Sequence, residues 1–207
     1  MSPSPLNLRI ASRSSTFATL LVLLCSCASA GCLGSRPALT PRFYLVPTSI
    51  AASPLAHNKA PALRLGRVTA APHLRDRITW RLSDVELAFD EESRWAVPPE
   101  DMLKEAIELS CFVTGRLLES KERGTPTLDV HLESFEGRIP ESDAVISIRM
   151  TLKDGDARSV ASRIVRLEPP LSEVRADTLA RALGAALDAA ATEIAEWVVQ
   201  TMKTPTP

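Results

Sequence analysis

Three cysteines near the amino terminus are the residues whose type and spacing suggest a defined chemistry. Cys25, Cys27 and Cys32 follow the largely apolar run Phe17 to Leu24. Arg9 and Arg13 are the only charged residues before that run. A positive start, a short apolar core and small residues after it are typical of a secretory signal peptide. The run is too short to predict a membrane-spanning helix. A cysteine in this position is typical of a lipoprotein, where the thiol receives a diacylglycerol and cleavage makes that cysteine the first residue.

Two of these cysteines fit a lipoprotein processing site, and we predict that Cys32 is the acylated one. Alanine and glycine precede Cys32, as is usual, but serine replaces the usual leucine. The alternative, Cys27, lies closer to the apolar core and has the leucine, but Cys25 stands unusually in the middle of its motif. Ordinary signal cleavage after Ala28-Ser29-Ala30, without lipidation, stays open as well, and the serine-rich start leaves an organelle transit peptide as a weaker alternative.

The predicted anchor also divides the chain into three segments and indicates which membrane holds the protein. Residues 1–31 are the expected signal peptide, residues 32–41 a tether and residues 42–203 the folded body. Acyl chains contribute about 0.8 kcal/mol for each buried methylene, so several chains hold a protein on a membrane. Neither Leu33 nor Ala28, which follow the two candidate cysteines, is an aspartate. Because aspartate at this position tends to retain enteric lipoproteins in the inner membrane, we predict the periplasmic face of the outer membrane.

The rest of the chain has no residue pattern of an active site. His57, His73 and His131 have no metal-ligand spacing to another histidine, a cysteine or an acid. The sequence has neither a glycine-rich phosphate loop nor a Gly-x-Ser-x-Gly elbow. The adjacent charges of Glu91–Arg94 are typical of a solvated surface. We therefore predict a protein that is not an enzyme and has neither a metal site nor a cofactor.

The charge distribution argues against a nucleic-acid-binding protein, and the remaining cysteine argues against a disulfide in the body. All 25 acidic residues, but only 16 of the 24 basic ones, lie from Asp76 onward. Nucleic-acid binding needs a concentrated basic surface, which this distribution does not provide. Cys111 is the only cysteine after residue 32 and lies in an apolar helical run, so we predict a buried thiol and no intrachain disulfide in the body.

The segment Pro72–Asp101 organises the predicted fold. Its two alternating stretches, Ile78–Leu82 and Val85–Phe89, predict a β-hairpin. Pro98-Pro99 predicts the start of a helix, because the missing proline N–H has no partner in a first turn anyway. An apolar stripe then continues to Gly115, which is expected to end the helix.

Further periodic segments surround this hairpin and helix. Alternation predicts strands over Arg42–Val46, Ala62–Ala70 with a bulge at Gly66, Thr127–Glu136, Ala144–Lys153 and Ser159–Leu167, and helical spacing predicts a long helix over Glu173–Met202. Residues 47–61 are expected to form a long loop. Two helices on one face of a sheet would bury all these apolar stripes. The fold class predicted is α+β, a single domain with a largely antiparallel sheet and two main helices on one face.

The order of several short motifs resembles a known family. The motifs are Cys32–Ser35, Arg42–Leu45, Leu65–Val68, Leu74–Arg77, Ile78–Arg81, Trp95–Pro99, Leu132–Glu136 and the alanine-rich last helix. In this order and spacing they resemble the ABC-type transport auxiliary lipoprotein family, which includes lipoproteins of the paraquat-inducible protein C type. The resemblance covers most of the mature chain.

This resemblance implies a non-enzymatic partner of an ABC permease, its ATPase and an MCE-domain substrate-binding protein. Such systems move lipids or other hydrophobic molecules between the two membranes of diderm bacteria. The expected mechanism is docking to the transporter, and a homo-oligomer stays open. The alternative is a stand-alone outer-membrane lipoprotein that itself binds a lipid or hydrophobic ligand, which would need an apolar pocket or groove.

Docking would use the organising segment, because arginine and tryptophan are over-represented at binding hot spots. The predicted partner-binding residues are Arg75, Arg77, Trp80, Arg81, Arg94 and Trp95. The competing interpretation places both tryptophans in the core and the arginines on a solvated edge.

Overall fold

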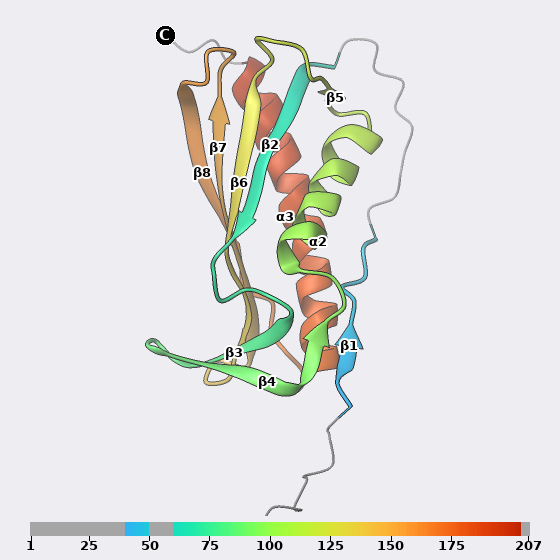
Figure 1. Cartoon of the computed structure of the whole chain (residues 1–207), viewed down its shortest axis with the longest axis vertical. Coiled ribbons are helices and arrows are strands. Elements are labelled where there is room, and N and C mark those ends of the chain that lie inside the picture. Colours follow the sequence, from blue (N-terminus) through green and yellow to red (C-terminus); the bar gives the residue numbers. More distant parts are fainter. Residues whose placement is uncertain (1–39, 50–59, 204–207) are drawn as a thin grey trace, which may run out of the picture. The chain divides into compact units, whose positions relative to one another are not determined.

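The computed structural model describes residues 40–49 and 60–203, which form a sheet with two helices packed against it (Figure 1). The predicted signal peptide, both candidate lipidation cysteines and residues 50–59 of the predicted loop lie outside the described residues. The strands are β1 (Arg42–Tyr44), β2 (Ala62–Ala70), β3 (Arg77–Ser83), β4 (Glu86–Trp95), β5 (Leu118–Glu119), β6 (Thr127–Arg138), β7 (Asp143–Lys153) and β8 (Ser159–Leu167). The helices are α2 (Pro99–Glu108), continued by a π-helical segment (Leu109–Val113), and α3 (Ala176–Lys203).

The sheet branches at β6. On one side β6 forms the long antiparallel ladder with β7, which in turn pairs with β8. On the other side the first part of β6 pairs in parallel with β2, and its last residues pair in parallel with β3. The antiparallel β3–β4 hairpin then extends the sheet to β1, which runs parallel to β4. The branch therefore gives the hairpin its own place on the sheet, away from β2.

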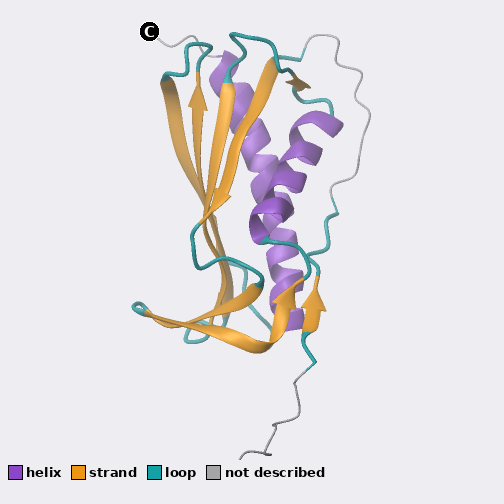
Figure 2. Ribbon diagram, viewed as in Figure 1, coloured by secondary structure: helices purple, strands orange, loops and turns teal. Residues whose placement is uncertain are grey.

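Both helices cover one face of the sheet, and a single apolar core lies between the layers (Figure 2). Helix α3 contributes Leu179, Leu183, Leu187 and Ile194, all fully or almost fully buried. Its many alanines keep the backbone close to the inward side chains of β6 and β7. The predicted α+β single domain with a largely antiparallel sheet is thus confirmed. Within the residues that the structure describes, neither helix is long and apolar enough to cross a membrane.

The bulge predicted at Gly66 is confirmed. The β2–β6 register shifts between Leu65 and Val68. A Cβ atom at Gly66 would lie 2.1 Å from Asp129 Oδ1, so the carboxylate occupies the space that a side chain would need. Asp129 uses that position to accept a hydrogen bond from the Arg67 N–H at 2.9 Å. Glycine therefore permits the close contact that closes this bulge.

Several element boundaries and one helix geometry differ from the sequence expectation. The first strand ends at Tyr44, because its partner β4 ends at Trp95. The long helix begins at Ala176 instead of residue 173. The helix before Gly115 changes from α to π geometry over its last turn, and Gly115 then takes a positive φ of 72°, the cap that was predicted.

Candidate functional site

Strand β4 bulges at Asp90. Phe89 pairs with Thr79 and Arg94 pairs with Arg77, so five steps along β4 correspond to two steps along β3. The Asp90 carboxylate closes the extra residues by accepting hydrogen bonds from the N–H groups of Ser93, at 2.7 Å, and Glu92, at 3.0 Å. The acidic stretch therefore belongs to the strand, whereas the sequence pattern ended the hairpin at Phe89.

The carbonyl groups of this bulge bind two of the predicted arginines. Arg77 Nη2 donates to the carbonyls of Phe89, at 3.1 Å, and Asp90, at 3.3 Å. Its guanidinium also lies over the Phe89 ring, 5.2 Å from the centroid, in a cation–π arrangement. Arg94 Nη1 donates to the carbonyls of Asp90, at 2.7 Å, and Ser93, at 2.9 Å. The bulge thus holds both guanidinium groups in fixed positions.

The two predicted tryptophans lie in the core. Trp80 is 8% exposed and Trp95 is 3% exposed. Trp80 Nε1 donates to Asp90 Oδ2 at 3.3 Å. Trp95 packs edge-on against Phe135, with ring centroids 5.3 Å apart. Their rings therefore support the surface from beneath, and direct contact with a partner would depend on other side chains.

The other two arginines differ in how tightly they are held. Arg81 Nε donates to Glu136 Oε1 at 2.6 Å, and the glutamate is only 1% exposed. The second oxygen, Oε2, has no hydrogen-bond partner among the described residues and lies 3.9 Å from His73 Nε2. Arg75 is exposed and donates to the carbonyl of Pro72 at 3.2 Å. A buried carboxylate therefore fixes Arg81, while the loop before β3 carries Arg75.

We call these four arginines and Phe89 the arginine surface, of which Arg77, Arg94 and Phe89 are brought together by the contacts at the Asp90 bulge. Phe89 is 36% exposed, and Val85 of the same alternating stretch is 95% exposed at the hairpin tip. The hairpin extends beyond the helices (Figure 1), so no described helix covers one of its faces. Alternation shows that a strand has two faces, but it does not show which face a distant helix will cover. Sequence reasoning missed Phe89 for this reason.

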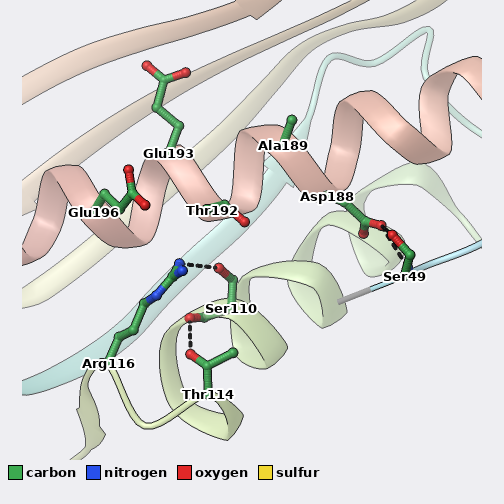
Figure 3. Close-up of a pocket in the computed structure, with 9 residues that line it drawn as sticks. All are labelled: Ser49, Ser110, Thr114, Arg116, Asp188, Ala189, Thr192, Glu193 and Glu196. Carbon is green, nitrogen blue, oxygen red and sulfur yellow. Dashed lines mark hydrogen bonds between the residues drawn. The ribbon is translucent and has the colours of Figure 1, made fainter. Parts of the chain in front are cut away.

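A second feature is a groove between the end of α2 and the middle of α3 (Figure 3). Asp188 Oδ2 accepts hydrogen bonds from the N–H and hydroxyl of Ser49 at 2.7 and 2.6 Å, and Arg116 Nη1 lies 3.4 Å from the Ser110 hydroxyl. The groove has a volume of about 640 Å³ and is lined by Ser49, Ser110, Thr114, Arg116, Asp188, Ala189, Thr192, Glu193 and Glu196. Only one of these residues is apolar, so the groove does not suit an acyl chain, which needs an apolar lining.

The described part of the chain shows neither a cluster of metal-binding side chains nor a reactive cysteine. It contains no group of three or more His, Cys, Asp or Glu side chains that could hold a metal ion. Cys111 is fully buried, as predicted, and burial raises the pKa of its thiol to about 12. A thiol with this pKa is protonated at neutral pH and is neither a good nucleophile nor a good metal ligand.

The carboxylate that closes the β4 bulge predicts a pH dependence. Burial opposes ionisation of Asp90, but the hydrogen bonds from Ser93, Trp80 and Glu92 outweigh it and lower the pKa of this carboxyl below its usual 3.8. A lowered pKa in the folded state means that the ionised group stabilises the fold above about pH 4, and that this contribution disappears as the pH falls through the folded pKa.

We therefore expect Asp90→Asn to lower the free energy of unfolding at pH 7 by no more than about 1 kcal/mol, because the group is partly exposed. The difference from wild type should shrink below about pH 3.5. Urea unfolding at a series of pH values checks this. A difference that stays constant from neutral to acidic pH would contradict the role of the ionised carboxylate.

Comparisons with known proteins place this fold in a family. The model of the ABC-type transport auxiliary lipoprotein component matches residues 43–195, which is more than half of the chain. Searching the curated proteins finds no match. A crystal structure of a Xanthomonas campestris protein of the family model DUF330 superposes with a TM-score of 0.69 at 24% identity, covering 78% of this chain and 97% of that one. The crystal structure of an uncharacterized protein superposes with a TM-score of 0.61 at 18% identity, covering 77% and 99%.

The two superpositions support the fold, and the family match carries the assignment. That match begins in β1 and ends in α3, so it spans the hairpin, the bulge and both helices. It agrees with the resemblance found in the sequence motifs. The chain belongs to the family of ABC-type transport auxiliary lipoprotein components.

Proposed function

We propose that this protein is a lipid-anchored, non-enzymatic component of an ABC transport system that includes an MCE-domain protein. It would act at the periplasmic face of the outer membrane and dock to a transporter that moves lipids or other hydrophobic molecules. Family membership supports the link to ABC transport. Docking through the arginine surface supplies the mechanism, and no catalytic step is required of the chain.

The observation that carries the docking proposal is the fixed position of the arginines beside an exposed aromatic ring. Arg77 and Arg94 bind the same carbonyl, that of Asp90, and Arg77 also covers Phe89. Side chains that are already ordered lose little conformational entropy when a partner binds. Each guanidinium keeps further N–H groups that can donate to a partner's carboxylates or carbonyls. Arginine and aromatic side chains together are the usual composition of a hot spot.

We expect Phe89→Ala and Arg94→Ala each to weaken binding to the MCE-domain partner by about tenfold or more, the effect of losing a hot-spot contact. Co-purification followed by titration of the purified components measures this. Ile164→Ala and Arg149→Ala are matched controls, because both residues are exposed on the sheet outside the arginine surface and should leave binding unchanged. If Phe89→Ala and Arg94→Ala stay folded and bind as well as the two controls, the arginine surface is not the docking site.

The lipid anchor has its own test. Metabolic labelling with a palmitate analogue should mark the wild-type protein and the Cys27→Ser variant, while Cys32→Ser should lose the label and appear in the soluble periplasmic fraction. The reverse pattern would assign the anchor to Cys27. An unlabelled wild-type protein would end the proposal of lipidation.

A further inference from the structure

Two large apolar side chains, one in strand β1 and one just after it, are covered by no described residue. Phe43 is 65% exposed and Leu45 is 64% exposed. They alternate with Tyr44 and Val46, which pack against the core. In an extended chain, residues two apart point to the same side, so Phe43 and Leu45 form one apolar pair directed away from the core. Large apolar side chains with this exposure at adjacent outward positions indicate a contact surface.

Strand β1 lies at the end of the body where α3 begins (Figure 1). A hollow next to β1 joins this strand to the β4 bulge and to the start of the helix, and it is lined by Arg42, Tyr44, Asp90, Glu91, Glu92, Ser93, Arg175, Ala176 and Asp177. Further along, Ser49 bonds to Asp188 in the middle of α3. The chain after β1 therefore runs along α3 from its first turns toward its centre, and β1 marks the amino-terminal end of that helix.

The distance between this end and the predicted anchor is limited by the length of chain between them. From Cys32 to Arg42 is ten residues, which span at most about 34 Å when fully extended. The same length as a flexible coil has a root-mean-square span of about 17 Å. Helix α3, with 28 residues, is about 42 Å long. The extended tether is thus shorter than the helix. If the opposite end of the body faced the membrane, the tether could not reach from β1 back to the bilayer.

We propose that Phe43 and Leu45 rest on the phospholipid bilayer that holds the lipid anchor, so that the body stands with its β1 end on the membrane. This inference rests on the anchoring part of the proposed function. Phenylalanine and leucine beside a basic side chain are the composition of surfaces that enter the boundary between lipid headgroups and acyl chains. Arg42, exposed next to Phe43, is long enough to keep its guanidinium at the headgroups while the apolar pair is buried. The two side chains set the orientation, and the acyl chains hold the protein.

Fluorescence quenching in vesicles tests the contact. The full-length lipidated protein is reconstituted into vesicles of phosphatidylethanolamine and phosphatidylglycerol that carry a headgroup quencher. Phe43→Cys is labelled with an environment-sensitive dye, and Val113→Cys, exposed where the α2 segment ends, is the control. Cys111 is fully buried and should not react with the dye. We expect quenching at position 43 to exceed that at position 113 by at least threefold, with a blue shift of the emission only at position 43.

A second substitution separates contact from mere proximity. In the Phe43→Cys background, Leu45→Glu should at least halve the quenching, because a carboxylate opposes burial in the bilayer. Leu118→Glu, at an exposed leucine of β5, should not change it. Equal quenching at positions 43 and 113, or no effect of Leu45→Glu, in protein that floats with the vesicles overturns this inference alone and leaves the pair open to a protein partner. Protein that does not float overturns both the anchor and the inference.

Discussion

Replacing Arg81 by alanine should lower the free energy of unfolding by about 3 kcal/mol, the lower end of the range for breaking a buried ion pair. Glu136 is 2% exposed at its side chain and Arg81 is 27% exposed, so the substitution leaves a carboxylate in the interior without its counter-charge. His73 does not replace the arginine, because its Nε2 atom lies 3.9 Å from the carboxylate, beyond hydrogen-bond distance. Urea unfolding at pH 7 measures the loss.

Two further variants show whether the effect comes from the buried charge. Arg149→Ala breaks an ion pair with Glu133 on the same sheet, but there the arginine is 53% exposed, so the expected change is below about 1 kcal/mol. The double variant Arg81→Met with Glu136→Leu should recover most of the stability, because replacing both members of a buried pair by apolar side chains is often neutral. If Arg81→Ala costs no more than Arg149→Ala, the carboxylate is not held as described.

Gly137→Ala should destabilise the fold by about 1–3 kcal/mol, the usual range for overpacking a core. A Cβ atom at this position would lie 2.3 and 2.5 Å from two carbon atoms of the Trp80 ring. Trp80 pairs directly with Gly137 in the short ladder that joins β3 to β6. The ring must therefore move, and the hairpin with its arginine surface moves with it. We expect weaker binding to the transporter partner as well as a lower melting temperature.

Relief of the clash provides the control for Gly137→Ala. Trp80→Phe shortens the ring and should cost stability by itself, since it empties part of the core. Combined with Gly137→Ala it should cost clearly less than the sum of the two single effects, because the smaller ring leaves room for the new methyl group. Strict additivity in the double-mutant cycle would show that the two residues are not in the contact described.

Local patterns predicted most of the fold, because in most elements the spacing of the apolar residues shows both the element type and the face that it buries. The strand β8 and the strand β2 have the predicted bounds, and the bulge at Gly66 and the cap at Gly115 follow from glycine's conformational freedom. The π-helical turn before Gly115 was not predicted. The continuation of β4 through Asp90 was not predicted either. Asp90 bonds to the nearby Ser93, but the strand continues only because Arg94 pairs with β3 beyond the bulge.

The candidate site was predicted only in part, and Trp80 shows why. Its residue type suggested a hot spot, and the competing interpretation suggested a core anchor. The structure places it against Gly137 on β6, which is far away in the sequence. Arg77 and Arg94 do lie together, but the carbonyls of the Asp90 bulge hold them there. Phe89 is exposed because neither of the two described helices covers that face of the hairpin.

By itself the sequence determined the fold class, the family resemblance and the lack of a recognisable catalytic pattern, and it predicted a lipidated cysteine, Cys32 or alternatively Cys27. These properties depend on composition, periodicity and short motifs, which are local. Only the tertiary structure decided which face of the β3–β4 hairpin is buried, how β6 branches between β2 and β3, and that no described residue covers Phe43 and Leu45. Exposure depends on which distant elements pack over a strand, and no local pattern contains that information.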